Sequence, residues 1–109
     1  MAEKFKVWTK YGGRCAYCGQ PLDINKMHKD HVIPRFKGGS DLLPNLMSAC
    51  APCNLWKKTL SVEEFREEIG KQIERVRRDS GGFRMAERYG LVKATGRPVR
   101  FFFEANKCF

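Results

Sequence analysis

The chain has 109 residues, a length that favours one domain with a modest core. Lysine and arginine number 21 against 12 aspartates and glutamates, so the formal net charge is +9. This excess favours an anionic partner such as nucleic acid, although a basic, solvated surface explains it equally well. No apolar run approaches the roughly 20 residues that span a bilayer, which argues against a membrane protein. The N-terminus lacks the apolar run of a signal peptide, so we expect a cytoplasmic protein.

The first half of the chain predicts short elements. Aromatic residues recur every three positions across residues 2–11, which favours a helix; they are Phe5, Trp8 and Tyr11. Residues 27–34 are expected to be extended, with a turn at Gly38 and Gly39. A further helix should begin near Ala51, because the proline after it suits a first helical turn.

The clearest predicted helix covers residues 62–78. Ser61 can cap its N-terminus, and Glu64 completes a capping box three residues later. Apolar residues recur at helical spacing and are expected to face the core; they are Phe65, Ile69, Ile73 and Val76.

The C-terminal part predicts a short helix over residues 83–89 and then a β-hairpin. Its two strands are expected at residues 91–95 and 98–104, around Gly96 and Arg97. The run Phe101–Phe103 favours a strand and is read as core rather than a partner surface. Helices and strands occur in separate parts of the chain, so the fold class is α+β.

Two cysteine pairs predict a structural zinc site. Cys15 and Cys18 form one pair, and Cys50 and Cys53 form the other. Four thiolates can surround one tetrahedral ion and leave no open position. The alternatives are free buried cysteines or two disulfides, which a cytosolic chain makes less favourable. Cys108 is unpaired, and we assign it no role.

The residues around and between the cysteine pairs resemble the HNH family of nucleases, also called His-Me finger or ββα-metal nucleases. The resemblance covers about residues 11–60, and its specificity comes from the order and spacing of several short motifs. With the cysteine pairs, these are Asp30-His31-Val32-Ile33-Pro34, Gly38-Gly39, Pro44-Asn45-Leu46, and Asn54 followed by Lys58.

The resemblance implies a ββα-metal core held by a four-cysteine zinc site. We therefore predict one HNH domain over residues 1–109, with its core at about 11–60. Residues 61–109 would add a long helix and a C-terminal β-hairpin to that core.

The same resemblance assigns roles to four residues. His31 would be the general base, and Asp30 and Asn54 would hold a catalytic ion. Asn45 would brace the loop and help to orient His31. The last H of the name HNH stands for a histidine that most family members have at the position of Asn54. This chain therefore resembles the asparagine-bearing variant, and its preferred catalytic metal stays open.

Chemistry supports these roles. An imidazole has an ordinary pKa of about 6.5, so at cellular pH it can take a proton from water. Carboxylate and amide oxygens suit Mg²⁺ or Mn²⁺ as the catalytic ion, and we expect weaker use of Ni²⁺ or Zn²⁺ there. The alternatives remain open: His31 as a buried, satisfied histidine, Asp30 as a turn cap, and Asn54 as an ordinary helix residue.

Four cations are candidate phosphate contacts. Arg35 and Lys37 follow the extended segment, and Lys57 and Lys58 share a helix face with Asn54. The helix lysines are also explained as a solvated face. His28 shares a strand face with Asp30 and is at least as well explained as a surface histidine.

The leading function hypothesis is a metal-dependent endonuclease that nicks or cuts DNA. Phosphate contacts carry no sequence information, so cutting should be weakly specific and sensitive to salt. One alternative is a zinc-dependent nucleic-acid-binding module of the same fold that does not cut. Another is a zinc domain for protein interaction. The sequence leaves the pathway, an oligomer and a protein partner open.

Overall fold

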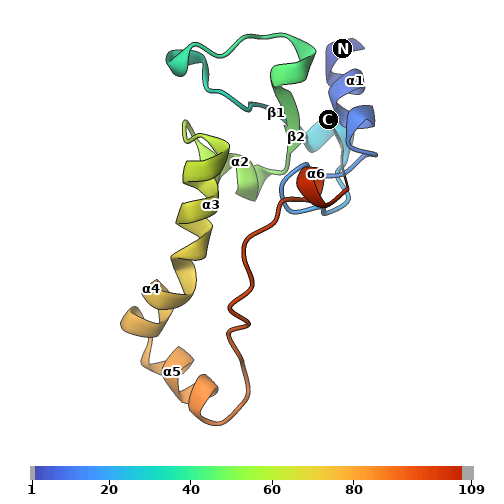
Figure 1. Cartoon of the computed structure of the whole chain (residues 1–109). Coiled ribbons are helices and arrows are strands. Elements are labelled where there is room, and N and C mark those ends of the chain that lie inside the picture. The colour runs from blue at the N-terminus through green and yellow to red at the C-terminus, as the bar shows by residue number, and fades with distance from the viewer. Residues whose placement is uncertain (1, 107–109) are drawn as a thin grey trace. The chain divides into compact units, whose positions relative to one another are not determined.

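The computed structural model describes the backbone of residues 2–106 (Figure 1). Its regular elements, in chain order, are α1 (Ala2–Lys10), η1 (Ile24–Lys26), β1 (His28–His31), η2 (Arg35–Lys37), η3 (Leu43–Asn45), β2 (Leu46–Ala49), α2 (Ala51–Lys57), α3 (Val62–Gly70), α4 (Gln72–Asp79), α5 (Gly81–Arg88) and α6 (Phe102–Ala105). Within this part of the chain, none of the helices combines the length and apolar character that a membrane crossing requires.

A two-stranded antiparallel hairpin and the helix after it form the centre of the motif region. His28 pairs with Ala49, and His31 pairs with Leu46. The helix α2 follows β2 after Cys50, with proline in its first turn, as predicted (Figure 1). This strand–strand–helix order confirms the α+β class and the ββα core. The strand is shorter than the predicted extended segment, since β1 ends at His31; after two further residues, Pro34 leads into η2.

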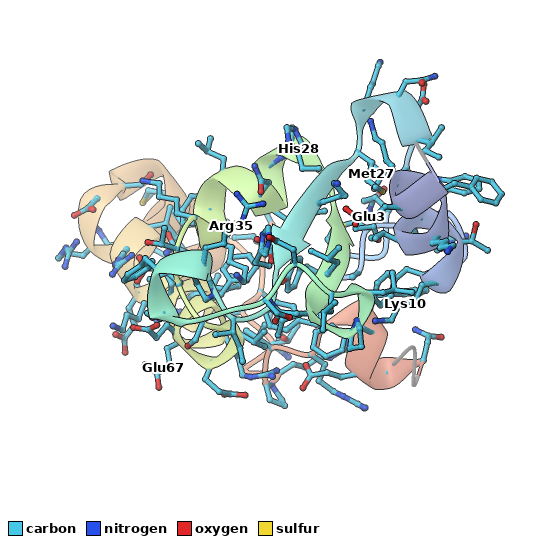
Figure 2. The ribbon with its side chains drawn as sticks, turned by 90° about the horizontal axis from the view of Figure 1, so that it is seen from above. Glu3, Lys10, Met27, His28, Arg35 and Glu67 are labelled. Atoms are coloured by element: carbon cyan, nitrogen blue, oxygen red, sulfur yellow. The ribbon has the colours of Figure 1, made fainter. Side chains whose placement is uncertain are left out.

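One apolar cluster attaches α1 to the hairpin. Val7, Met27 and Leu46 are buried together, and the partly buried Trp8 and Leu22 pack against them. The indole of Trp8 donates a hydrogen bond of 2.7 Å to the carbonyl of Leu22. Met27 therefore lies beside α1 and fixes the start of β1 (Figure 2).

A second cluster is aromatic and centres on Tyr17. Its ring meets Phe65 and Phe101 edge-on, with centroids 5.4 and 5.2 Å away. Phe65 and Phe101 stack on each other at 5.3 Å. Such edge-to-face and offset pairs are favourable beyond the area they bury. The cluster joins the first cysteine turn to the start of α3 and to the C-terminal segment.

The predicted C-terminal hairpin is wrong. Across residues 91–106, all of which are described, the chain forms no strand and ends in α6. The backbone amides of Phe102 and Phe103 donate to the carbonyls of Tyr17 and Ala16, each at 2.9 Å. The carboxylate of Glu104 accepts from the amide of Phe101 at 3.0 Å and begins the helix. Burial of Phe101 thus overrides the β-propensity of the run, in line with its reading as core.

The predicted helix over residues 62–78 forms as two helices, because α3 ends at Gly70 and α4 begins at Gln72. Its capping box is present: the amide of Glu64 donates to the Ser61 hydroxyl at 3.1 Å, and the Glu64 carboxylate accepts from the Ser61 amide at 2.9 Å. Only the first part of the apolar stripe is core. Phe65 is 1% exposed, whereas Ile73 is 41% exposed.

The chain divides into two compact units. The first, the motif unit, combines residues up to Phe65 with those from Arg100 onward. The second, the helical unit, spans Arg66–Val99, and the structure describes all of its residues. No residue of the helical unit is buried. It contains α4 and α5, and the Ser80 hydroxyl caps α5 by accepting from the amide of Phe83 at 3.0 Å. The single-domain assignment stays a prediction.

Candidate functional site

The four predicted zinc ligands come together. The sulfurs of Cys15, Cys18, Cys50 and Cys53 all lie within 4.8 Å of one another, and these cysteines form no disulfide. The sulfurs of Cys18 and Cys50 are 3.8 Å apart. Zinc–sulfur bonds of about 2.3 Å place tetrahedral sulfurs about 3.8 Å apart, so the cluster fits this ion. Cys108 lies outside the described residues.

Hydrogen bonds within the cluster stabilise a thiolate at Cys15, the form that binds a metal cation. The pKa of the Cys15 thiol is lowered to about 4, chiefly because the Cys53 thiol donates a hydrogen bond to its sulfur. The backbone amide of Cys50 also approaches that sulfur, at 3.4 Å. Thiolates bind zinc, and Cys15 already favours this form. The pKa values of the Cys18 and Cys53 thiols are raised instead.

Asp30 is buried among protein partners. The Tyr17 hydroxyl donates to its Oδ2, and the ammonium nitrogen of Lys57 lies 3.1 Å from the same oxygen. Burial and the neighbouring Asp30 carboxylate raise the pKa of Tyr17 strongly, so the phenol stays protonated and donates. The carboxylate therefore has a fixed orientation at the inner side of β1.

Lys57 is not available as a phosphate contact. Its side chain is 0% exposed, and its ammonium group also donates to the carbonyl of His31 at 3.0 Å. A buried lysine must be paired, and here Asp30 provides the opposite charge. The sequence prediction that Lys57 binds nucleic acid is therefore corrected: Lys57 neutralises Asp30, and its neighbour Lys58 is the exposed lysine.

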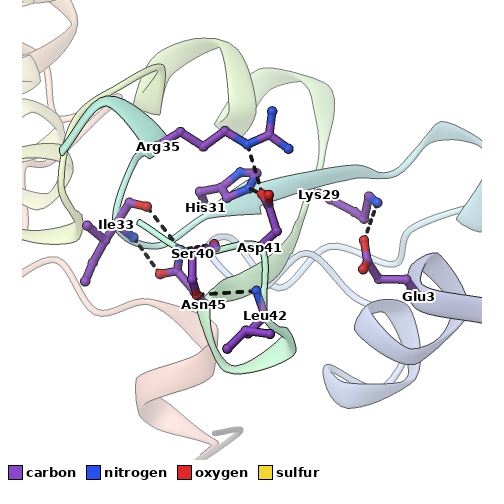
Figure 3. Close-up of polar contacts among 9 residues, drawn as sticks. All are labelled: Glu3, Lys29, His31, Ile33, Arg35, Ser40, Asp41, Leu42 and Asn45. Carbon is purple, nitrogen blue, oxygen red and sulfur yellow. Dashed lines mark hydrogen bonds and ion pairs between the residues drawn. The ribbon is translucent and has the colours of Figure 1, made fainter. Parts of the chain in front are cut away.

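His31 has a partner that the sequence analysis missed. Its Nε2 lies 2.7 Å from Oδ1 of Asp41, and the same oxygen accepts from Nε of Arg35 at 2.9 Å (Figure 3). Hydrogen bonds from His31 and Arg35 lower the pKa of Asp41, so this carboxylate stays ionised. Asp41 lies ten residues after His31 in an irregular loop, where spacing gives no signal of the contact.

Asn45 ties together the loop that carries Asp41. Its side-chain oxygen accepts from the amide of Ile33 at 2.9 Å, and its amide nitrogen donates to the carbonyls of Ile33 and Ser40 at 3.1 and 2.7 Å (Figure 3). Gly39 packs against Ile33, which lies just after β1. A Cβ at Gly39 would lie 1.7 Å from the Ile33 carbonyl oxygen, so the loop closes only with glycine there.

Three of the predicted catalytic residues line one hollow. This hollow, of about 400 Å³, is bordered by Asp30, His31 and Asn54. Arg35 and Lys58 also line it and add positive charge. His31 comes from β1 and Asn54 from α2, so the strand–strand–helix core sets their separation. The arrangement brings an imidazole, two oxygen-bearing side chains that can ligate a cation, and two basic side chains to one hollow.

Two other candidates lie elsewhere. Lys37 forms an ion pair of 2.5 Å with Glu64, which lowers the pKa of that carboxyl to about 2. His28 is exposed at the start of β1 (Figure 2).

Comparison with known proteins identifies the family. A family model described as HNH endonuclease matches residues 15–69, about half of the chain. The chain belongs to the HNH endonuclease family. The resemblance stated from the sequence motifs is thus confirmed, and membership of the HNH family supports a nuclease-type function.

Two relatives give this HNH chain a structural context. It is 31% identical over 74 residues to the CRISPR-associated endonuclease Cas9 of Corynebacterium diphtheriae, a match that covers 59% of this chain and 7% of the relative. The crystal structure of the Type II-C Cas9 enzyme from Actinomyces naeslundii superposes with a TM-score of 0.57 at 23% identity. That match covers 62% of this chain and 7% of the other, and it shows a shared fold. The HNH chain thus spans only a small part of the length of either relative.

Proposed function

We propose that this chain is a metal-dependent endonuclease that hydrolyses DNA phosphodiester bonds, with His31 as the general base. The observation that carries the proposal is the shared hollow, where His31 meets the oxygen donors Asp30 and Asn54 in an HNH-family chain. The side chain of His31 is 20% exposed, so water and substrate can reach its ring.

The imidazole of His31 takes a proton from water as the water oxygen attacks phosphorus. The bond from phosphorus to one sugar oxygen breaks, and that oxygen leaves with the electron pair and gains a proton from solvent. Positioned proton transfer of this kind contributes about 10²–10⁴-fold to a rate. Asn45 keeps the loop after β1 closed, which holds His31 and its surroundings in place.

Asp30 and Asn54 are the residues that would hold the catalytic Mg²⁺ or Mn²⁺. Their donors are a carboxylate and an amide oxygen, which hard divalent ions prefer. Lys57 and Tyr17 already contact Oδ2 of Asp30, but Asp30 still lines the hollow. A divalent ion held there would supply charge neutralisation at the phosphate and at the leaving oxygen. The Lys57 ammonium repels such an ion, so we expect the site to bind it weakly.

The four cysteines hold a structural Zn²⁺ in this proposal, and the geometry of their sulfurs supports it. Bound zinc would join the turn of Cys15 and Cys18 to the start of α2, the helix that carries Asn54. The metal that folds the chain is thereby separate from the metal that serves the reaction.

DNA binding is proposed through Arg35 and Lys58, the two cations at the hollow. Lys37 stays a prediction, and its ion pair with Glu64 would have to open first. Lysine and arginine contacts to phosphates make affinity fall steeply with salt and give little sequence preference. The endonuclease named as a relative agrees with a nucleic-acid substrate.

Plasmid nicking tests the proposal. Wild type, His31→Ala and His28→Ala are incubated with supercoiled plasmid in Mg²⁺ or Mn²⁺, and relaxation is followed on gels. We expect His31→Ala to lose about 10²–10⁴-fold in rate. His28→Ala should keep wild-type activity, because His28 is exposed at the start of the same strand.

Zinc content and near-UV circular dichroism show whether each variant is folded. Equal nicking by wild type and folded His31→Ala contradicts the role of His31. A wild type that binds DNA at low salt but does not nick it in either metal favours the binding-module alternative. Absence of both binding and nicking favours a protein-interaction domain.

A further inference from the structure

We infer that Asp41 is a positioning residue for the general base, and that its carboxylate holds the His31 ring with Nε2 protonated and Nδ1 free to accept a proton. The inference rests on the proposed function and adds a residue and a reacting atom to it. Its basis is the contact of 2.7 Å between Nε2 of His31 and Oδ1 of Asp41.

The chemistry of the two partners fixes the direction of this hydrogen bond. An ionised carboxylate can only accept, so the imidazole nitrogen that faces it must donate. Arg35 donates to the same Oδ1 at 2.9 Å and keeps Asp41 in its charged form (Figure 3). In a neutral ring the proton therefore lies on Nε2, and the lone pair lies on Nδ1.

The loop between β1 and β2 aims the carboxylate. Asn45 donates to the carbonyl of Ser40 at 2.7 Å, one residue before Asp41, and also binds the backbone of Ile33. The Ser40 hydroxyl approaches the amide of Leu42 at 3.3 Å, one residue after Asp41. Backbone restraints thus flank Asp41 on both sides. Asn45 acts on His31 through Ser40 and Asp41.

During hydrolysis the water proton moves to Nδ1, and the ring becomes an imidazolium. Asp41 remains ionised and stabilises that positive charge, while the proton on Nε2 stays in place. Carboxylates that hold a histidine in one tautomer act in this way in other hydrolases.

A purely structural role is a poor explanation of the contact. The Asp41 side chain is 67% exposed, and exposed ion pairs contribute little to stability. Replacing Asp41 should therefore leave the fold intact and change the reaction selectively.

The test measures kcat and KM for plasmid nicking with Asp41→Ala and Asp41→Glu. We expect Asp41→Ala to lower kcat roughly tenfold to a hundredfold with little change in KM, because partners that orient a functional histidine have effects of this size. Asp41→Glu should recover most of kcat, since the exposed loop lets the longer side chain reach the ring. Glu67→Gln, an exposed charge change in the helical unit, is the matched control and should leave kcat unchanged.

Imidazole ¹⁵N chemical shifts give a second readout that needs no activity. Wild type should show His31 with its proton on Nε2 at neutral to alkaline pH, and Asp41→Ala should show a mixture of tautomers. An unchanged kcat together with an unchanged tautomer overturns the inference. So does a lower KM at unchanged kcat, which would mean that Asp41 only restrains Arg35 from the substrate. If wild type does not nick at all, the proposed function fails while the tautomer measurement still decides the role of Asp41.

Discussion

The motif unit and the helical unit are stabilised in different ways. In the motif unit, apolar clusters around Val7 and Tyr17 enclose the hairpin, and four cysteines gather at one point. The helical unit, which the structure describes in full, buries no residue. Its helices carry a side-chain cap at Ser80 and exposed ion pairs such as Arg77 with Glu87, each of which contributes little. Every proposed functional residue lies in the motif unit, where packing can hold side chains precisely. The predictions that follow test this contrast.

Metal removal should give the largest effect and should act on the motif unit. Structural zinc bound by four thiolates contributes on the order of 10 kcal/mol or more to folding. With excess chelator we expect the aromatic near-UV dichroism to disappear cooperatively and amide protection to be lost in β1, β2 and α2. Amides of α4 and α5 should exchange quickly both before and after chelation, because no buried side chain protects those helices. Unchanged near-UV dichroism in a chain shown to be metal-free would contradict the zinc proposal.

Two alanine substitutions compare how much a side chain of each unit contributes to stability. Both residues belong to the apolar stripe predicted for residues 62–78. Phe65→Ala should destabilise the protein by about 4 kcal/mol, because the ring is 1% exposed and stacks in the Tyr17 cluster. Ile73→Ala should cost less than about 1 kcal/mol, because Ile73 is 41% exposed in α4. Urea unfolding of the zinc-loaded protein measures both. Equal losses would show that the helical unit has a core of its own.

Substitutions of the adjacent residues Lys57 and Lys58 test whether Lys57 is the cation that pairs with buried Asp30. Lys57→Met should cost about 3 kcal/mol in unfolding free energy, since it leaves the buried Asp30 carboxylate without its cation. Lys58→Met should cost less than about 0.5 kcal/mol, because Lys58 is exposed. The two variants make the same chemical change one residue apart. If urea unfolding shows a larger loss of unfolding free energy for Lys58→Met than for Lys57→Met, Lys57 is not the cation that stabilises Asp30.

The smallest expected effect concerns the Arg77–Glu87 pair of the helical unit. The Arg77 guanidinium donates to Glu87 and lowers the pKa of that carboxyl from its ordinary 4.5. A lowered folded-state pKa means that the pair favours the folded form above about pH 4.5, and that this contribution is lost as the pH falls through the folded pKa. In Arg77→Gln, the carboxyl titration of Glu87 followed by NMR should shift upward towards 4.5. Glu68, whose partner is Arg75, is the internal control and should titrate as in wild type.

The features that could be predicted from the sequence are those with a local cause. The spacing of Cys15 and Cys18 allows two sulfurs on one turn, and the Ser61–Glu64 capping box involves neighbours only. The C-terminal hairpin failed for a tertiary reason. Phe101 has a strand-like local sequence, but Tyr17 and Phe65 bury its ring and its segment continues as a helix.

The site shows the same limit. The motif order was sufficient to name His31 and Asn54, which the structure places at one hollow. The motif order could not show that the Lys57 side chain is buried against Asp30. This burial depends on the tertiary contact between the Tyr17 hydroxyl and the Asp30 carboxylate. The motif order could not show Asp41 either, because the loop conformation set by Asn45 decides what reaches the ring.

The close approach of Gly39 to the carbonyl of Ile33 has a consequence for how such proteins vary. Exposed loops usually accept many substitutions, and Gly38 next to it meets no neighbouring atom, although its positive φ still favours glycine. At Gly39 even a methyl group collides with fixed backbone rather than with a side chain that can move. A randomised library of this loop, selected for DNA cleavage, should therefore return only glycine at position 39, even though the residue lies in an exposed loop.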